Sequence, residues 1–318
     1  MPLIHSRFRP AWWLRSAHAQ TLWPALLRRR PRLQVTWERL ELDDGDFLDL
    51  AWSGPDDAPI VMLFHGLQGS IHSHYAGALM HHLNRQGLRA CLMHFRGCSG
   101  VPNRLPISYH SGKTDDPQRL LEHIAAVSGG PPFAAVGVSL GGNVLLKWLG
   151  EQGPASPLRR AAALSVPFRL DAAADRLQHG LSRLYQRHLV TSMQAAYRRK
   201  FSRMSSPLDV DVGRLTTFRL FDDQVTAALH GFDGVDDYYS RCSSRPFIAN
   251  IRVPTLILHA QDDPFMFPDT PPASDELPEN VFLELTPHGG HAGFIGGRLP
   301  GWPDYYAERR IAQWIAAD

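Results

Sequence analysis

Short runs of apolar residues alternate with stretches of helical periodicity along most of the chain. Two early segments, 33–42 and 47–52, alternate apolar and polar residues, which predicts antiparallel strands with one solvated face, joined by a turn at Asp44-Gly45. Further strands are predicted at 59–65, 89–95, 133–138, 160–166, 255–260 and 281–286. Helices are predicted at 73–87, 115–128, 140–152 and 303–316. The alternation predicts an α/β fold with a mostly parallel central sheet flanked by helices.

Residues 168–246 interrupt this rhythm. They show helical periodicity but contain no run that predicts a buried strand. Because the strand pattern resumes at residue 255 as if it continued the same sheet, we expect an inserted helical lid rather than a separate domain. The prediction is a single domain over 1–318, with a lid at about 168–246 and an N-terminal arm at 1–32.

The arm differs from the rest of the chain in composition. The first forty residues hold eight Arg and four Trp but one acid, Glu38. Such a mixture is typical of a segment that lies on a membrane surface. The alternative is that it packs along the domain, with arginine stems covering apolar surface. We favour packing, because Pro10, Pro24 and Pro31 would break a long amphipathic helix.

Composition excludes several classes of protein. Of 318 residues, 44% are apolar and 20% charged, as in an ordinary globular chain, and no apolar stretch is long enough to span a membrane. The net charge of +2 is too balanced to indicate a nucleic-acid-binding protein. The three cysteines have no CxxC spacing, which argues against a disulfide framework or a zinc site. With no signal-peptide pattern at the N-terminus, we expect a cytoplasmic location.

A G-x-S-x-G motif at 137–141 follows a predicted strand and opens a predicted helix. This context is typical of a nucleophile elbow, in which a sharp turn lifts Ser139 above the sheet. Gly137 and Gly141 would be needed because side chains there would collide with neighbouring elements. The backbone N–H of Leu140, at the start of the helix, would then help to bind an oxyanion.

A nucleophilic serine needs a base and an acid that orients it, in the chain order Ser, Asp or Glu, His. Asp262 and Asp263 follow the strand at 255–260, and we favour Asp263 as the acid. His288 and His291 follow the last strand, and we favour His291 as the base. The H-x-x-H spacing could also suggest a metal pair, but it lies on a Gly-Gly loop rather than a helix, so no metal is expected.

Further residues are candidates for substrate contacts. His65-Gly66 follows the strand at 59–65, so the N–H of Leu67 is a candidate second oxyanion donor, with Gly66 beside it. Apolar side chains of the lid would line an acyl pocket, with Leu184 and Met193 as the chief candidates, or would simply pack on the core. That apolar stripe comprises Leu181, Leu184, Tyr185, Leu189, Met193 and Tyr197.

At this point the chain resembles the α/β-hydrolase superfamily, and within it the YheT-like hydrolases, which are related to eukaryotic α/β-hydrolase-domain proteins. The resemblance implies a serine hydrolase of carboxylic esters with relatives that act on lipids. It also supports Asp263, His291 and an arm that is part of the domain. It rests on AHAQTLWPALLRR (17–29), HGLQGSIHSHYA (65–76), HFRGCSGVPNRLPISYHSGKTDD (94–116), GVSLGGNVLLKWLGE (137–151), HGFDGVDDYYSRCS (230–243), ILHAQDDPF (257–265) and HGGHAGF (288–294).

We therefore expect a serine esterase for short- to medium-chain acyl esters, acting through Ser139, His291, Asp263 and an acyl-enzyme. No metal or organic cofactor is expected. The partner would be a small-molecule or lipid ester and not a nucleic acid. Two alternatives remain: a membrane-facing lipase or phospholipase, for which peripheral membrane contact would be needed, and a non-catalytic binding protein with a hydrolase fold.

Overall fold

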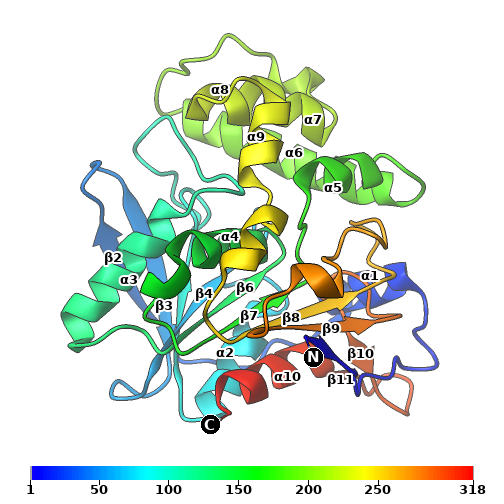
Figure 1. The fold of residues 1–318 in the computed structure, drawn as a ribbon. Helices are drawn as coiled ribbons and strands as arrows, with labels where there is room; N and C mark the ends of the chain where they lie inside the picture. The colour runs from blue at the N-terminus through cyan, green and yellow to red at the C-terminus, as the bar shows by residue number, and fades with distance from the viewer. Residues whose placement is uncertain (1, 318) are drawn as a thin grey trace.

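The computed structural model describes residues 2–317, and a nine-stranded sheet forms the centre of this region (Figure 1). The strand order is β1-β9-β8-β7-β6-β4-β5-β3-β2, and neighbours pair in parallel except at β2–β3 and β3–β5. The strands are β1 (Leu3–Ile4), β2 (Thr36–Glu41), β3 (Phe47–Ser53), β4 (Ile60–Phe64), β5 (Arg89–Met93), β6 (Ala134–Val138), β7 (Arg160–Leu164), β8 (Thr255–Ala260) and β9 (Val281–Thr286). The predicted α/β class with a mostly parallel sheet is confirmed.

Helices cover both faces of the sheet, and each face carries its own hydrophobic core. Helices α3 (Asp115–Ser128) and α4 (Leu140–Gln152) pack on one face, and α2 (Ala76–Arg85) and α10 (Tyr306–Ile315) pack on the other. Burial on both faces explains why the central strands read as apolar runs.

One strand differs from its prediction. We expected one solvated face on both antiparallel strands, and β2 does alternate between exposed and half-buried positions. Strand β3 is buried along its whole length, because it lies inside the sheet with side chains packed against both cores. Its polar residue Asp49 is accommodated by an ion pair with Arg39 and a hydrogen bond from Ser99.

The arm contains elements that the sequence pattern did not reveal. Helix α1 (Ala17–Leu27) runs through Pro24, and a hairpin of β10 (Ile295–Gly296) and β11 (Asp304–Tyr305) lies beside it. Pro24 has no N–H to donate to the carbonyl of Gln20, so it removes one hydrogen bond from the helix, which nevertheless continues to Leu27.

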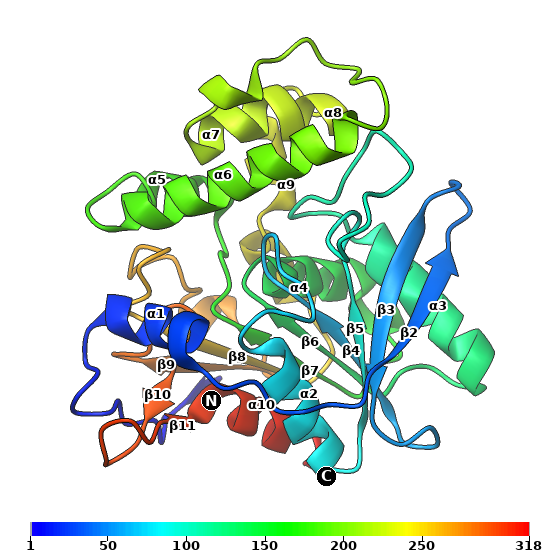
Figure 2. The ribbon, with the colours of Figure 1, turned by 180° about the vertical axis from the view of Figure 1, so that it is seen from behind.

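Between β7 and β8 the chain forms only helices, which stand over the carboxyl ends of the strands (Figures 1 and 2). They share a hydrophobic cluster of their own, separate from the two sheet cores. The α-helices of this segment are α5 (Leu170–Arg176), α6 (Ser182–Phe201), α7 (Phe218–Phe221), α8 (Ala228–His230) and α9 (Val235–Cys242). None of the helices in residues 2–317 combines the length and the apolar character needed to cross a bilayer.

Candidate active site

A sharp turn between β6 and α4 carries Ser139. Its φ of 55° and ψ of −120° lie outside the regions that side-chain-bearing residues normally adopt. The glycines around it are required by close contacts: a Cβ added at Gly137 would lie 2.3 Å from the carbonyl oxygen of Gly141, and one at Gly141 would lie 2.4 Å from that of Phe64. The turn therefore holds the serine side chain above the end of the sheet.

Ser139, His291 and Asp263 form one hydrogen-bonded chain. The Nε2 atom of His291 lies 3.0 Å from the Oγ atom of Ser139, and its Nδ1 atom lies 2.8 Å from the Oδ2 atom of Asp263. Asp263 is only 2% exposed, and the backbone N–H of Phe265 donates to its other oxygen at 2.8 Å. The Phe265 ring stacks on the His291 ring at 4.0 Å between centroids. Both ends of the imidazole and one of its faces are thus fixed.

The two alternative residues pair with each other instead. His288 Nδ1 lies 3.2 Å from Asp262 Oδ2, and the His288 side chain is about half exposed. Asp262 also accepts the backbone N–H of Gly290 at 2.9 Å. The two adjacent carboxylates therefore have different partners: Asp263 contacts the imidazole of His291, whereas Asp262 contacts His288 and the backbone of the glycine loop that carries His291.

Helix α1 of the arm holds this loop from the other side. The Oγ1 atom of Thr21 accepts the backbone N–H of His291 at 2.9 Å. The buried side chain of Gln20 donates to the carbonyls of Leu14 and Ile295 and accepts the N–H of Ile295. Analysis of the sequence missed both contacts. The available signal was the resemblance over 17–29, which marks this segment as part of the domain.

The backbone N–H groups around Leu67 differ in whether they have a hydrogen-bond acceptor. The N–H of Gly66 donates to the Tyr75 hydroxyl at 2.7 Å, and that of Gln68 donates to the Tyr109 hydroxyl at 2.8 Å. The N–H groups of Leu67 and Leu140 have no acceptor within the described residues. This leaves them available to an external acceptor such as an oxyanion, a role that stays a prediction.

His65, at the start of the same loop, has a structural role. Its Nδ1–H donates to the carbonyl of Gly66 at 2.7 Å, and its Nε2 accepts the N–H of Phe95 at 3.1 Å. Burial lowers the pKa of His65 to about 3, so the ring stays neutral and keeps both bonds.

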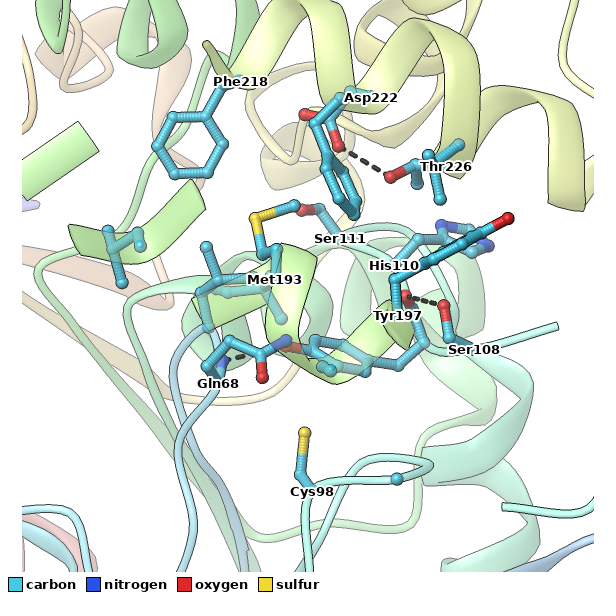
Figure 3. Close-up of a pocket in the computed structure, with 18 of the residues that line it drawn as sticks. Gln68, Cys98, Ser108, His110, Ser111, Met193, Tyr197, Phe218, Asp222 and Thr226 are labelled. Atoms are coloured by element: carbon cyan, nitrogen blue, oxygen red, sulfur yellow. Dashed lines mark hydrogen bonds between the residues drawn. The ribbon is translucent and has the colours of Figure 1, made fainter. Parts of the chain in front are cut away.

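A cavity lies between the carboxyl ends of the strands and the helices that follow β7, and Ser139 and His291 are among the residues that line it. Figure 3 shows Met193, Phe218 and Asp222 of these helices around the cavity. Leu67, Leu140 and Met193 of α6 line the cavity, and their contact with a substrate stays a prediction. The cavity surface is mostly apolar, which suits a hydrocarbon chain. Other apolar residues between β7 and β8 that line the cavity include Leu177, Leu189, Tyr197, Phe218 and Phe221.

Two residues predicted to contact the substrate, Leu184 and Gly66, do not line this cavity. Leu184 does not line the cavity and its side chain is 64% exposed. It precedes Met193 by nine residues, which is about 180° of rotation around a helix, so the two point in opposite directions. Gly66 is buried next to Ser139, where an added Cβ would lie 3.3 Å from the Cβ atom of Ser139, and its N–H donates to the Tyr75 hydroxyl.

The cavity is also lined by polar side chains that the sequence motifs did not predict. Asp222, in a π-helical turn (Asp222–Ala227), accepts hydrogen bonds from Thr226 and Tyr239, and burial raises its pKa to about 6. Lys200 donates to Asn103 at 2.8 Å, and burial lowers its pKa to about 8. These bonds tie the lid helices to one another and to the core. Across the described residues, no three His, Cys, Asp or Glu side chains are grouped so as to bind a metal ion.

Comparisons with known proteins identify related sequences. Residues 59–297 match the family model described as the alpha/beta hydrolase fold. YheT of Escherichia coli (strain K12), an esterase by name, is 43% identical over 98% of this chain and 93% of its own length. Phospholipase ABHD3 of Bos taurus is 29% identical, covering 99% of this chain and 80% of its own.

Solved structures show the same fold at low sequence identity. The Pyrococcus furiosus esterase Pf2001 superposes with a TM-score of 0.53 at 14% identity, covering 83% of this chain and 89% of its own. A monoacylglycerol lipase from Paleococcus ferrophilus gives a TM-score of 0.53 at 17% identity, covering 85% and 98%.

Proposed function

Because the chain belongs to the α/β-hydrolase family, and within it to the YheT-like hydrolases, we propose that it is a serine esterase with Ser139 as nucleophile. The observation that carries this proposal is the hydrogen-bonded chain from Ser139 through His291 to Asp263. A protein that only binds ligands would have no need for a strained serine joined to an imidazole and a buried carboxylate.

The reaction proceeds by acyl transfer. Ser139 Oγ attacks the ester carbonyl carbon while His291 Nε2 takes its proton, and Asp263 holds the resulting imidazolium. The oxyanion accepts the N–H groups of Leu67 and Leu140, each worth about 3 kcal/mol in comparable sites. The carbon–oxygen bond to the alcohol then breaks, and the alcohol leaves with the proton from His291. Water repeats the sequence on the acyl-enzyme and releases the acid. No step needs a metal or an organic cofactor.

The apolar cavity supports acyl esters of short to medium chain length as substrates, supplied by a small molecule or a lipid. A lipase or phospholipase activity is the second candidate, because relatives are named as a phospholipase and a monoacylglycerol lipase. Hydrolysis rates for p-nitrophenyl esters from acetate to palmitate separate the two. A maximum at butyrate to octanoate supports the esterase, and a maximum at palmitate supports the lipase.

Labelling with a fluorophosphonate probe tests the catalytic proposal directly, because the probe reacts with activated serines. We expect the wild type to be labelled, Ser139→Ala to be unlabelled and His291→Ala to be labelled at least about a hundredfold more slowly. His288→Ala is the matched control and should label like the wild type. Folded protein that resists the probe, or His291→Ala that labels at the normal rate, would leave only a binding role.

The state of the cysteines indicates the kind of cellular compartment in which the protein works. Cys91, Cys98 and Cys242 are all free thiols, and two of them are buried. Unpaired cysteines suit a reducing compartment, which supports the proposal of a cytoplasmic location.

A further inference from the structure

Helix α1 reverses the usual pattern of a surface helix, because it buries polar side chains and exposes apolar ones. Its polar residues Gln20 and Thr21 are buried, whereas Leu22, Leu26 and Leu27 are exposed, Leu26 by 74%. A helix on the surface of a globular protein normally turns its apolar side chains to the core. The burial of Thr21 is explained by its bond to His291 and that of Gln20 by its bonds to Leu14 and Ile295, but the leucines remain exposed in the described chain.

More exposed apolar side chains lie next to this helix. The Trp12 indole N–H donates to the carbonyl of Arg298 at 2.9 Å, which joins the arm to the loop between β10 and β11. That loop exposes Leu299 and, by 78%, Trp302. In both ribbon views α1 and the β10–β11 hairpin lie at the same end of the molecule (Figures 1 and 2). We call this surface the arm face; it comprises Trp12, Leu22, Leu26, Leu27, Leu299 and Trp302.

The unpaired charges around the arm face are positive, because the exposed carboxylate next to Trp302, Asp304, is paired with Arg309. Residues 1–37 contain no Asp or Glu, although the whole chain is nearly balanced at +2. Arg15, Arg29 and Arg30 are exposed and form no salt bridge with any described residue, and Arg298 is exposed beside Trp302. Within the described part of the arm, the arginine that does form an ion pair is Arg28, with the buried carboxylate of Glu308.

Exposed apolar side chains together with unpaired arginines favour one class of binding partner. If a second copy of the chain packed on the arm face through a two-fold axis, the unpaired arginines would face each other and repel. An anionic bilayer neutralises arginines at the level of the headgroups and receives tryptophan and leucine side chains just below them. We propose that the arm face docks on the surface of an anionic phospholipid bilayer.

Helix α1, which carries part of the arm face, is also linked to the reacting groups through His18. His18 of α1 contacts the Tyr185 hydroxyl of the lid at 3.0 Å, Tyr185 packs on Phe265, and Phe265 stacks on His291. Docking would thus hold the junction of arm and lid at the bilayer, one ring away from the catalytic base. The docking itself goes beyond the proposed esterase function and does not depend on it.

Vesicle sedimentation tests the proposal with purified full-length protein. We expect binding to vesicles that contain phosphatidylglycerol, weaker binding to pure phosphatidylcholine, and loss of binding as salt is raised. Leu26→Ser with Trp302→Ser should lower the partition coefficient roughly tenfold, and Arg29→Gln with Arg30→Gln severalfold. Val127→Ser is the matched control, because Val127 is 64% exposed on α3 at a distance from α1.

Two results would overturn the proposal. In the first, the wild type stays in the supernatant with anionic vesicles. In the second, the variant with both Leu26→Ser and Trp302→Ser binds vesicles like the wild type. A dimer in light scattering that the same variant dissociates, without vesicle binding, would assign the arm face to a second copy. Hydrolysis of a soluble ester should be unchanged in all these variants, so binding without any esterase activity would reject the proposed function and leave the docking intact.

Discussion

Replacing Asp263 by asparagine should abolish most activity, because it moves the proton of the His291 ring from Nδ1 to Nε2. The backbone N–H of Phe265 can only donate, so it keeps the oxygen of the new amide side chain at the position of Oδ1. The amide nitrogen then replaces Oδ2 and faces His291 Nδ1, which must accept. The ring proton moves to Nε2, which can no longer take the proton of Ser139.

The size of the effect follows from this wrong tautomer and from the lost negative charge behind the imidazolium. Together they should lower kcat about 10⁴-fold, as the same change does in other serine hydrolases. This corresponds to about 5 kcal/mol of transition-state stabilisation. The substrate cavity is unchanged, so KM should stay within a few-fold.

The assay is kcat for p-nitrophenyl acetate with Asp262→Asn as the matched control. Asp262 is the adjacent carboxylate but pairs with the half-exposed His288, so its variant should retain kcat within about threefold. Thermal unfolding of both variants checks that they fold. Equal losses in the two variants, or an Asp263→Asn enzyme that keeps more than a tenth of wild-type kcat, would refute the reasoning.

Three further variants test the arm, the elbow and the lid. Thr21→Val leaves the N–H of His291 without its acceptor, so the free energy of unfolding measured in urea should fall by about 1–3 kcal/mol, and kcat should also fall. Thr21→Ser keeps the hydroxyl and should preserve both quantities. Gly141→Ala drives a Cβ against a backbone carbonyl of β4, so its Tm should fall sharply, whereas Gly130→Ala, which meets open space, should be near neutral. Because the folded pKa of Asp222 is raised to about 6, the folded state binds more protons than the unfolded state between pH 4 and 6. Stability should therefore fall by up to about 3 kcal/mol as the pH rises over that range, and Asp222→Asn should flatten the dependence in urea titrations at pH 4 and 7.

Most strands and core helices were predictable because their signal is local. The helices at 115–128 and 140–152 and the strand at 255–260 have the predicted bounds, since each carries its own apolar period and end signals. The burial of β3 was not predictable, because its apolar–polar alternation is the same for an edge strand and for one covered on both faces. Helix α1 escaped detection for a related reason: its buried residues are polar and its exposed ones apolar.

The candidate site divides in the same way. Sequence alone determined the strand-turn-helix around Ser139. It also placed the loops that carry Asp263 and His291 at the same edge of the sheet, because parallel strands bring their carboxyl ends together. Only the tertiary structure decided that Asp263 rather than Asp262 meets His291, that Thr21 holds the base loop, and that Met193 rather than Leu184 faces the cavity. A local pattern fixes the conformation of a segment, whereas these choices depend on which face of the segment meets a partner distant in the chain, and that is set by packing of the whole molecule.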